Sequence, residues 1–546
     1  MSSDKATKAY VELEQRFHQM AALGHAGSIL SKDRETAMPR GGAASRIEQQ
    51  IALGKAVHDI ISNPEMEELL CEAETGRESL PPKLRKNLEL MRNSWIHEAS
   101  LPSDLAEAAS LASAEGEEMH DAHYKSGDWS KMEAVYKKSF DIARECGQII
   151  MEKIGAASPY EANIDKYSRG MKVERIQKEY APLRDKLPGM IQQAVELQKS
   201  APAPKPLTGE FSVERQMILN RQILKAMGFD FNRGKIDAII GHPSSGGAPN
   251  DIRLSSRCEK STFIPSSYAA IHEGGHGLYD LNTPEDIDET TKRPIYRMVN
   301  GSMGMDVHES QSLIMEVQAG MSTEFIVGYL SQQAQKVFNA PPRLEEMPEI
   351  GTARWLKECA LWIARTSTMN DRGLSSENLL RTIQRVEPSF IRVDADEMTY
   401  PMHVMLRFEL EQEIMDRRLD VSDLPAAWNE KMKNYLGITP PGNHQGCMQD
   451  VHWPAGLIGY FPFYSRGAMI AAQFAAAARH EHPDLDKDLG RGDFSKLLGW
   501  LNENVHSKGS LLDTDDLIVQ ATGETLNPEH FLAHLNKRYL KMDPKI

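Results

Sequence analysis

Cysteine is scarce in this chain: there are five residues among 546, and no two of them form a Cys-x-x-Cys pair. The scarcity excludes a disulfide scaffold and a cysteine-based zinc cluster, and it favours a reducing compartment. Basic residues are also in deficit, because 63 Lys and Arg against 78 Asp and Glu leave a formal net charge of -15. A nucleic-acid-binding protein normally shows the opposite imbalance, so we expect no nucleic-acid partner.

Long apolar runs are missing as well. No stretch supplies the roughly 18 consecutive apolar residues of a membrane-spanning helix, and the alanine-rich segment from Gly467 to Ala478 comes closest. The opening residues, MSSDKATKAYVELEQ, lack the apolar segment of a secretory signal. We therefore expect a cytoplasmic protein that does not bind membranes.

Apolar residues recur at helical spacing through most of the chain. The first stripe comprises Tyr10, Leu13, Phe17, Met20 and Leu23. Gly24 is the expected end of that helix. Similar patterns predict helices over residues 43–73, 103–155, 171–199, 308–336, 352–366, 374–386, 402–418 and 466–482. The fold is therefore predicted to be mostly α.

Strand-like alternation is confined to two short segments. They are Asp251–Leu254 and Met298–Met305, on either side of a helix predicted over 265–281. We expect them to form a small β element beside that helix. Pro and Gly cluster in 200–209, and a coarse division near residue 205 separates an N-terminal helical region (about 1–205) from a catalytic region (about 206–546) of one domain over 1–546.

The strongest chemical signal is the sequence His272-Glu273-Gly274-Gly275-His276. Residues four apart lie on one face of a helix, so both imidazoles can reach a single Zn²⁺. Glu273 can then take a proton from a water at the metal, as in metallopeptidases with the HExxH motif. Pro265, followed by two serines, supplies a helix start. Alternatively, because two glycines cost about 2 kcal/mol in an exposed helix, the segment is a frayed helix with two solvent-facing histidines.

A catalytic zinc needs a third protein ligand and an open position for water. Glu309 lies 33 residues after His276, at the start of another helical pattern. His308 is the local competitor, and Asp306 and Glu316 are weaker ones. The spacing alone does not choose among them, because acidic residues are usually exposed on helix faces.

Five colinear motifs resemble those of the Taq-type thermostable zinc carboxypeptidases. The motifs are Asp251-Ile252-Arg253-Leu254-Ser255, the HEGGH segment, His308-Glu309-Ser310-Gln311, Ile391-Arg392-Val393-Asp394-Ala395-Asp396 and Gly446-Cys447-Met448-Gln449-Asp450-Val451-His452-Trp453. The chain departs from the family pattern at Ser244, where phenylalanine is usual, and at Met315, in a region that is usually aromatic. Both departures bear on the expected shape of the substrate pocket.

The resemblance implies that His272, His276 and Glu309 hold zinc and that Glu273 is the general base and later the proton donor to the leaving amine. It also implies a large helical fold in which helices line a deep groove over the metal. Zinc is the default ion, although nitrogen and oxygen ligands also accept Co²⁺ or Mn²⁺.

Peptide hydrolysis needs a hydrogen-bond donor for the oxyanion of the tetrahedral intermediate. His452, Tyr460 and Tyr464 are the candidates, because a neutral imidazole or a phenol can donate there. We favour His452 and Tyr464, and assign Tyr460 to substrate binding. The alternative for each tyrosine is a core residue whose hydroxyl is hydrogen-bonded.

An exopeptidase acting at the C-terminus must recognise a free carboxylate, which a guanidinium can bind bidentately. The resemblance points to Arg392 for this role, with Asp394 and Asp396 orienting it. The alternative is a structural ion-pair network with those aspartates. Gln449 and Asp450 could support a ligating histidine, whereas Arg253 with Asp251 is read as mainly structural.

The residues and the resemblance together predict a zinc metallocarboxypeptidase. We expect it to remove single C-terminal residues with broad specificity from peptides with a free C-terminus. The resemblance also implies a homodimer. One alternative is an oligopeptidase or dipeptide-releasing peptidase on the same fold, and the other is a catalytically inert helical scaffold.

Overall fold

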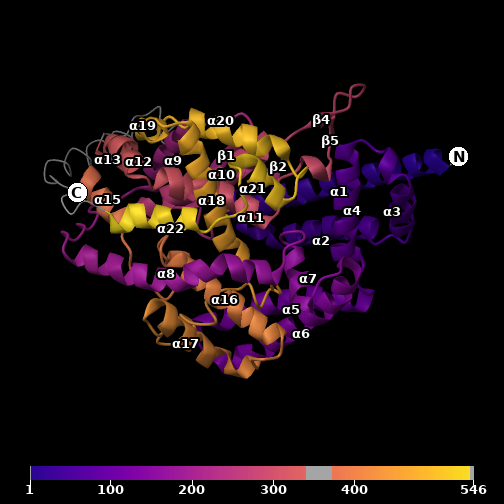
Figure 1. The fold of residues 1–546 in the computed structure, drawn as a ribbon, viewed down its shortest axis with the longest axis horizontal. Helices are drawn as coiled ribbons and strands as arrows, with labels where there is room; N and C mark the ends of the chain where they lie inside the picture. Colours follow the sequence, from indigo (N-terminus) through magenta and orange to yellow (C-terminus); the bar gives the residue numbers. More distant parts are fainter. Residues whose placement is uncertain (1, 340–371, 542–546) are drawn as a thin grey trace.

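Helices form most of the computed structural model, which describes residues 2–339 and 372–541 (Figure 1). The first part contains α1 (Ser2–Thr36), α2 (Ala43–Ile61), α3 (Glu65–Thr75), α4 (Pro82–Ala99), α5 (Ser103–His123), α6 (Trp129–Ile154), α7 (Pro159–Asp165), α8 (Val173–Lys199) and α9 (Val213–Met227). The second contains α10 (Ile264–Asn282), α11 (Met305–Leu313), α12 (Thr323–Phe325), α13 (Ser331–Asn339), α15 (Ser376–Ile383), α16 (Tyr400–Met415), α17 (Leu424–Leu436), α18 (Pro462–Glu481), α19 (Leu485–Gly490), α20 (Ser495–Asn504), α21 (Thr514–Thr522) and α22 (Glu529–Leu535). The mostly α prediction is confirmed, while the helix predicted over 352–366 lies outside the described residues.

The first helix is longer than predicted. α1 continues through Gly24 to Thr36, so the predicted end at Gly24 is wrong. The C-terminal half of α1 is held by contacts that the local sequence does not reveal: Ser28 accepts a hydrogen bond from the Gly247 amide, and Lys32 donates one to Ser244. Tertiary contacts therefore extend the helix beyond its apolar stripe.

Several predicted helices are divided. Residues 43–73 form α2 and most of α3, with Pro64 at the junction, and residues 103–155 are divided between α5 and α6 at Gly127, which has a left-handed φ of 66°. Asp128 then caps α6 through the amide of Ser130. Residues 308–336 span α11, the π-helical turns η5 (Ile314–Gly320) and η6 (Ile326–Leu330), α12 and part of α13.

A small three-stranded sheet lies beside α10. Its strands are β1 (Gly234–Ile239), β2 (Ser245–Ala248) and β3 (Asp251–Arg257), in the order β1-β3-β2. β3 is parallel to β1 and antiparallel to β2, with Leu254 opposite Ile236 and Ser245. Ile252 and Leu254 alternate toward the buried side, where they meet Gly277 of α10. The predicted β element beside this helix is thus present.

The second predicted strand is wrong. Met298–Asn300 is the 3₁₀ turn η4, and Met305 begins α11. The Val299 amide donates to the Asn87 side chain, and its carbonyl accepts from the Ser510 amide. These distant partners take the place of a neighbouring strand. A separate two-stranded ribbon, β4 (Asp286–Ile287) with β5 (Pro294–Ile295), lies earlier in the chain and projects from the body (Figure 1).

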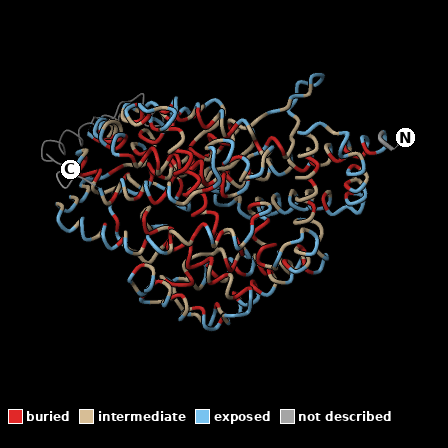
Figure 2. Tube along the Cα trace, viewed as in Figure 1, coloured by how far each residue is buried: buried red, intermediate tan, exposed pale blue. Residues whose placement is uncertain are grey.

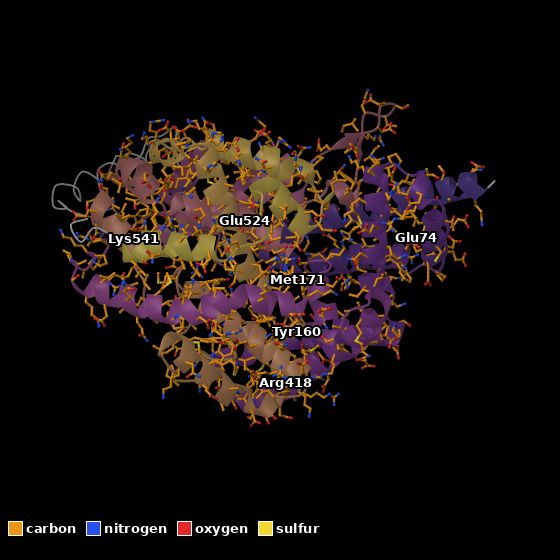
Figure 3. All side chains as sticks on the ribbon, viewed as in Figure 1. Glu74, Tyr160, Met171, Arg418, Glu524 and Lys541 are labelled. Atoms are coloured by element: carbon orange, nitrogen blue, oxygen red, sulfur yellow. The ribbon has the colours of Figure 1, made fainter. Side chains whose placement is uncertain are left out.

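The buried residues, red in Figure 2, include two hydrophobic clusters within the described part of the chain. The smaller cluster holds α1 to α4 together, and the larger one runs from Met132 to Tyr539. The larger cluster contains residues from both sides of position 205. The division of the chain into two regions near residue 205 stays a prediction. The deep groove over the metal stays a prediction too. Glu74 lies among the N-terminal helices and Lys541 at the other end of the long axis (Figure 3). Within 2–339 and 372–541, no helix combines the length and the apolar character needed to cross a membrane.

Candidate metal centre

The two glycines of HEGGH allow helices to approach α10 closely. A Cβ at Gly274 would stand 2.4 Å from a Leu224 methyl of α9, and a Cβ at Gly275 would stand 2.5 Å from the backbone oxygen of Gln311 in α11. Both glycines are buried within a continuous helix. The alternative of a frayed, solvent-facing helix is therefore wrong, because packing against neighbouring helices offsets the low helix propensity of glycine.

Close packing of α10 and α11 brings three potential ligands together. The nitrogens of His272 and His276 and a carboxylate oxygen of Glu309 all lie within 4.8 Å of one another. Glu309 Oε2 is 3.5 Å from His276 Nε2 and 4.0 Å from His272 Nε2. Among the described residues, this is the single group of three or more histidine, cysteine or acidic side chains with a spacing that fits a metal ion.

The other residues considered as third ligands point elsewhere. His308 stacks on His276 but its Nε2 lies 3.2 Å from Asp280. Asp306 is fully buried and pairs with Arg466. Glu316, on the π-helical turn η5, lies 2.8 Å from Nδ1 of His272, the ring nitrogen opposite the one that faces Glu309. Glu316 therefore fixes the orientation of His272 rather than facing the centre.

The charge balance of the cluster fits a cation. Burial alone lowers the pKa of His272, but the Glu316 hydrogen bond and the charges of Glu309, Glu316 and Glu273 raise it to about 10. Burial lowers the pKa of His276 to about 4, which keeps that imidazole in its neutral, ligating form. Three carboxylates, those of Glu273, Glu309 and Glu316, thus lie around two imidazoles in a largely buried site, and a divalent cation would balance their charge.

Glu273 has the environment of a general base. The residue is 6 % exposed, and burial raises its pKa, whereas the charges of His272 and Lys32 oppose the rise. A carboxylate with a raised pKa takes up a proton more readily near neutral pH. Lys32 acts on this region through its charge from α1, an influence that no sequence motif indicated.

The start of α18 brings aromatic side chains to the same centre. A Cβ at Gly467 would lie 2.9 Å from Glu309, and Tyr464, one helical turn earlier, shares that face of α18. Burial raises the pKa of Tyr464 well above its ordinary value, and the nearby Glu309 charge adds to the rise. The rings of Tyr460 and Tyr464 are 5.4 Å apart, centroid to centroid.

His452 completes this aromatic group. Its ring lies 5.5 Å from the ring of Tyr460 and 4.6 Å from that of Phe461. Burial lowers the pKa of His452 to about 4, so the imidazole is neutral at physiological pH. Asp450 Oδ1 is 4.0 Å from His452 Nδ1, too far for a hydrogen bond.

Arg392 lies in a buried ion pair. Its Nε and Nη2 donate to Asp450 at 3.2 and 2.8 Å, and its Nη1 donates to the Tyr400 hydroxyl at 2.8 Å. Asp450 also pairs with Arg407, a residue that the motif analysis missed. The two arginines hold the pKa of Asp450 far below its ordinary value despite burial. One N–H on each terminal nitrogen of Arg392 has no partner among the described residues.

The expected helpers of Arg392 and of the histidines have other partners. Asp396 accepts from the backbone of Glu387, Met398 and Thr399, so it shapes the turn before α16 instead of orienting Arg392. Gln449 accepts from the Arg392 amide and donates to loop carbonyls, so neither it nor Asp450 bonds a ligating histidine. Arg253 and Asp251, for which a mainly structural role is expected, form an ion pair on β3.

The two departures from the family pattern lie in different surroundings. Met315 is 1 % exposed in the core. Ser244 contacts Lys32 and Glu35 of α1. Ser244 therefore joins the first helix to the sheet beside α10.

The chain is similar to known peptidases over nearly its whole length. The sequence model of the carboxypeptidase Taq (M32) metallopeptidase family matches residues 12–343 and 343–539. Carboxypeptidase 1 of Bacillus subtilis is 28% identical over 533 residues, 97% of each chain. The structure of Trypanosoma cruzi metallocarboxypeptidase 1 superimposes with a TM-score of 0.87 and 34% identity over 97% of this chain and 99% of the other. The structure of the M32 carboxypeptidase from Deinococcus radiodurans superimposes with a TM-score of 0.83 and 28% identity, over 97% of this chain and 99% of the other.

Proposed function

The chain belongs to the carboxypeptidase Taq (M32) family of metallopeptidases and is a metallocarboxypeptidase. From this premise we propose that it uses a zinc ion, held by His272, His276 and Glu309, to remove single residues from the C-terminus of peptides. The observation that carries the proposal is the approach of two imidazoles and one carboxylate, from two separate helices, to within 4.8 Å of one another. Two histidines and one glutamate are a ligand set of catalytic zinc.

Zinc is proposed over other ions because of the donor set. Two nitrogen donors and one oxygen donor suit Zn²⁺, and they also accept Co²⁺ or Mn²⁺. The hydrogen bond from His272 to Glu316 gives this histidine the second partner that ligating histidines usually have.

Glu273 is the proposed general base. When bound, the metal polarises the scissile carbonyl and lowers the pKa of a water. Glu273 is adjacent to a ligand on α10, is buried, and has a raised pKa. It accepts the proton of the attacking water and later donates it to the leaving amine.

The oxyanion of the tetrahedral intermediate needs a donor that remains protonated. The pKa of Tyr464 is raised well above its ordinary value, so its hydroxyl keeps its proton, and the neutral His452 ring lies in the same aromatic group. We propose these two as the donors. Tyr460, whose ring lies between them and Tyr167, is proposed to contact the substrate.

Arg392 is the proposed recognition site for the substrate carboxylate. Asp450 and Tyr400 hold the guanidinium in place, and the two remaining terminal N–H groups are free to bind the carboxylate. Broad specificity for the residue removed, a cytoplasmic location, a homodimer and the single-domain organisation are further parts of the proposal.

A digestion time course tests this function. A peptide with a free C-terminus and the same peptide with a C-terminal amide are followed by mass spectrometry, with and without chelator. The proposal predicts successive losses of one residue from the free peptide, no loss from the amide, and arrest by chelator. Losses of two residues or internal cleavage would instead indicate a dipeptide-releasing or endo-acting peptidase.

Glu273→Gln separates the chemistry from metal binding. The variant should retain one equivalent of metal by elemental analysis, and its turnover should fall by about 10² to 10⁴. Glu430→Gln, an exposed glutamate on α17, is the matched control and should behave as the natural protein. Full turnover by the Glu273 variant would refute the proposed mechanism. No hydrolysis by the natural protein would favour an inert scaffold.

A further inference from the structure

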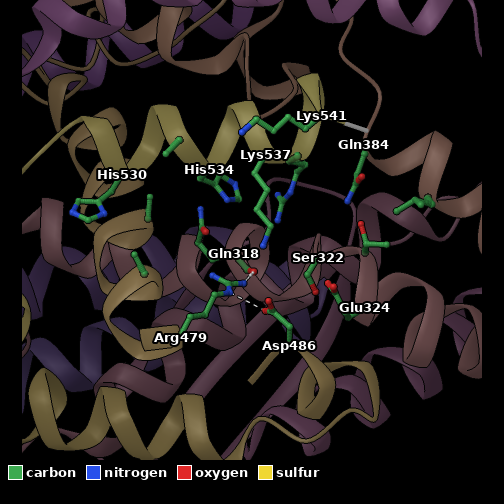
Figure 4. A pocket seen from close by; sticks show the side chains of 16 residues that line it. Gln318, Ser322, Glu324, Gln384, Arg479, Asp486, His530, His534, Lys537 and Lys541 are labelled. Atoms are coloured by element: carbon green, nitrogen blue, oxygen red, sulfur yellow. Dashed lines mark hydrogen bonds and ion pairs between the residues drawn. The ribbon is translucent and has the colours of Figure 1, made fainter. Parts of the chain in front are cut away.

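A cavity of about 420 Å³ lies between η5, the end of α18 and the C-terminal helices (Figure 4). Its volume is within the range of small-molecule sites. None of its described lining residues belongs to the candidate metal centre or to its aromatic group. The lining includes Glu324, Leu380, Ala472, Arg479, Lys537 and Lys541.

Several charges of the lining are already compensated. Arg479 pairs with Asp486 at 2.8 Å and donates to the carbonyl of Gln318. Arg538 pairs with buried Glu397 and donates to the carbonyl of Val317. His530 and His534 lie 2.7 and 2.6 Å from carboxylates that do not line the cavity, those of Glu524 and Glu397.

Three charged side chains of the lining, two cationic and one anionic, have no charged or hydrogen-bonding partner. They are Lys537, Lys541 and Glu324, whose side chains make no ion pair or hydrogen bond with each other or with any other residue that the structure describes. Figure 4 shows Lys537 reaching from the C-terminal helices toward the side where Ser322 and Glu324 lie. Unpaired charges of both signs at one partly open cavity suit a ligand with both a cationic and an anionic group.

Part of the lining is apolar. Leu380 is 1 % exposed, and Ala472 is 3 % exposed. Ala476 and Ala533 add methyl groups to the same cavity. The wall therefore offers room for an aliphatic side chain, whose transfer from water is favourable.

We propose that this cavity binds a free α-amino acid with an aliphatic side chain. Lys537 binds its carboxylate, Glu324 binds its ammonium group, and the side chain lies against the apolar wall. An inorganic anion would leave the Glu324 carboxylate without a charged partner, and an alkylamine would leave both lysines without one. A free amino acid is also what the proposed function releases, and this part of the argument rests on that function.

Titration calorimetry with leucine tests the proposal on the metal-loaded full chain. Lys537→Ala and Glu324→Ala should each weaken leucine binding about tenfold or more, as expected for loss of a charged hydrogen bond. Both residues are exposed on helices, so the variants should fold, which circular dichroism checks. Lys433→Ala and Glu430→Ala, exposed on α17, are the matched controls and should bind as the natural protein does.

Modified ligands distinguish the zwitterion from simpler ions. N-acetylleucine lacks the cation and leucinamide lacks the carboxylate, so each should bind at least tenfold more weakly than leucine. Equal binding of N-acetylleucine, or competition by inorganic phosphate at the same concentration, would show a simple anion site and overturn the proposal. Stronger binding of dileucine than of leucine would show a peptide site and would overturn it too.

The binding site is located by two further comparisons. Binding in the cavity should persist when the metal is chelated and should be unchanged in Arg392→Lys. The proposal would be overturned if leucine binding depended on the metal or survived both alanine substitutions. It would also be overturned if no binding were seen at the highest soluble leucine concentration. Because calorimetry does not depend on turnover, these results are separate from those of the digestion experiment.

Discussion

Gly467 of α18 lies directly against Glu309 of α11. A Cβ at position 467 would stand 2.9 Å from both Cβ and Cγ of Glu309 and 3.3 Å from the backbone oxygen of Asp306. This distance is shorter than a normal contact between carbon atoms, so a side chain at 467 must displace α18 or the glutamate. The absence of a side chain at Gly467 therefore fixes the position of the proposed metal ligand.

Gly467→Ala should weaken metal binding. We expect metal affinity to fall about tenfold or more, and the free energy of unfolding to fall by about 1 to 3 kcal/mol because of overpacking. Competition with a chromophoric chelator measures the affinity, and urea unfolding measures the stability. Gly499→Ala in α20 is the control: nothing lies within 4 Å of its added Cβ, so it should leave affinity unchanged and stabilise the helix by about 1 kcal/mol. Unchanged affinity in Gly467→Ala would contradict the role assigned to this contact.

Glu316→Gln should lower metal affinity by about 10- to 100-fold, because the hydrogen bond at His272 Nδ1 would no longer be charged. The same chelator competition gives the value. Asp280→Asn changes the partner of His308, which is not a proposed ligand, and should have a much smaller effect. An equal effect of the two substitutions would argue against Glu316 as the partner that orients a ligand.

Arg392→Lys should raise KM for peptides with a free C-terminus by about 10- to 150-fold, since lysine keeps the charge and loses the paired N–H geometry. Steady-state kinetics on free and amidated peptides measure the effect, and the low rate on the amide should not change. Asp450 keeps Arg407 as a partner in this variant, which limits the loss of stability. If Arg392→Lys lowered the free energy of unfolding but left KM unchanged, Arg392 would have only a structural role in the ion pair with Asp450.

The fall in the free energy of unfolding at acidic pH should depend on Glu397. Burial alone raises its pKa, but the charges of His534 and Arg538 and its hydrogen bonds lower it to about 2, below the ordinary 4.5. A carboxylate with a depressed folded-state pKa contributes stability above its unfolded pKa and loses it as the pH falls toward the folded value. The full contribution is about 3 kcal/mol, of which about 2 kcal/mol is lost by pH 3.

Urea unfolding between about pH 6 and pH 3 measures this contribution. Glu397→Gln has no carboxylate to protonate, so its deficit relative to the natural protein should narrow by about 2 kcal/mol over that range. Glu529→Gln, at an exposed position of α22, should keep a constant difference. A Glu397→Gln deficit that stays constant with pH would show that the carboxylate is not held ionised by its neighbours.

The local sequence was sufficient for features that repeat every few residues. The spacing of His272 and His276 determined that both imidazoles share one face of α10, since a helix returns to the same side after four residues. Apolar periodicity located most helices, and Asp251–Leu254 was recognised as a strand because Ile252 and Leu254 alternate with polar neighbours. The same local rules failed where distant partners decide, as at Gly24 and at Met298–Met305.

The sequence alone did not determine which of four residues is the third candidate ligand: Glu309, His308, Asp306 or Glu316. All four lie within eleven residues, and their local patterns are equivalent, so the selection depends on which side chain faces α10 after α11, η5 and α18 have packed. Glycines at the contacts set that arrangement, because they let the helix backbones approach to distances that a Cβ would prevent. Sequence periodicity thus defined the helix that carries two histidines, and long-range packing decided which acid meets them.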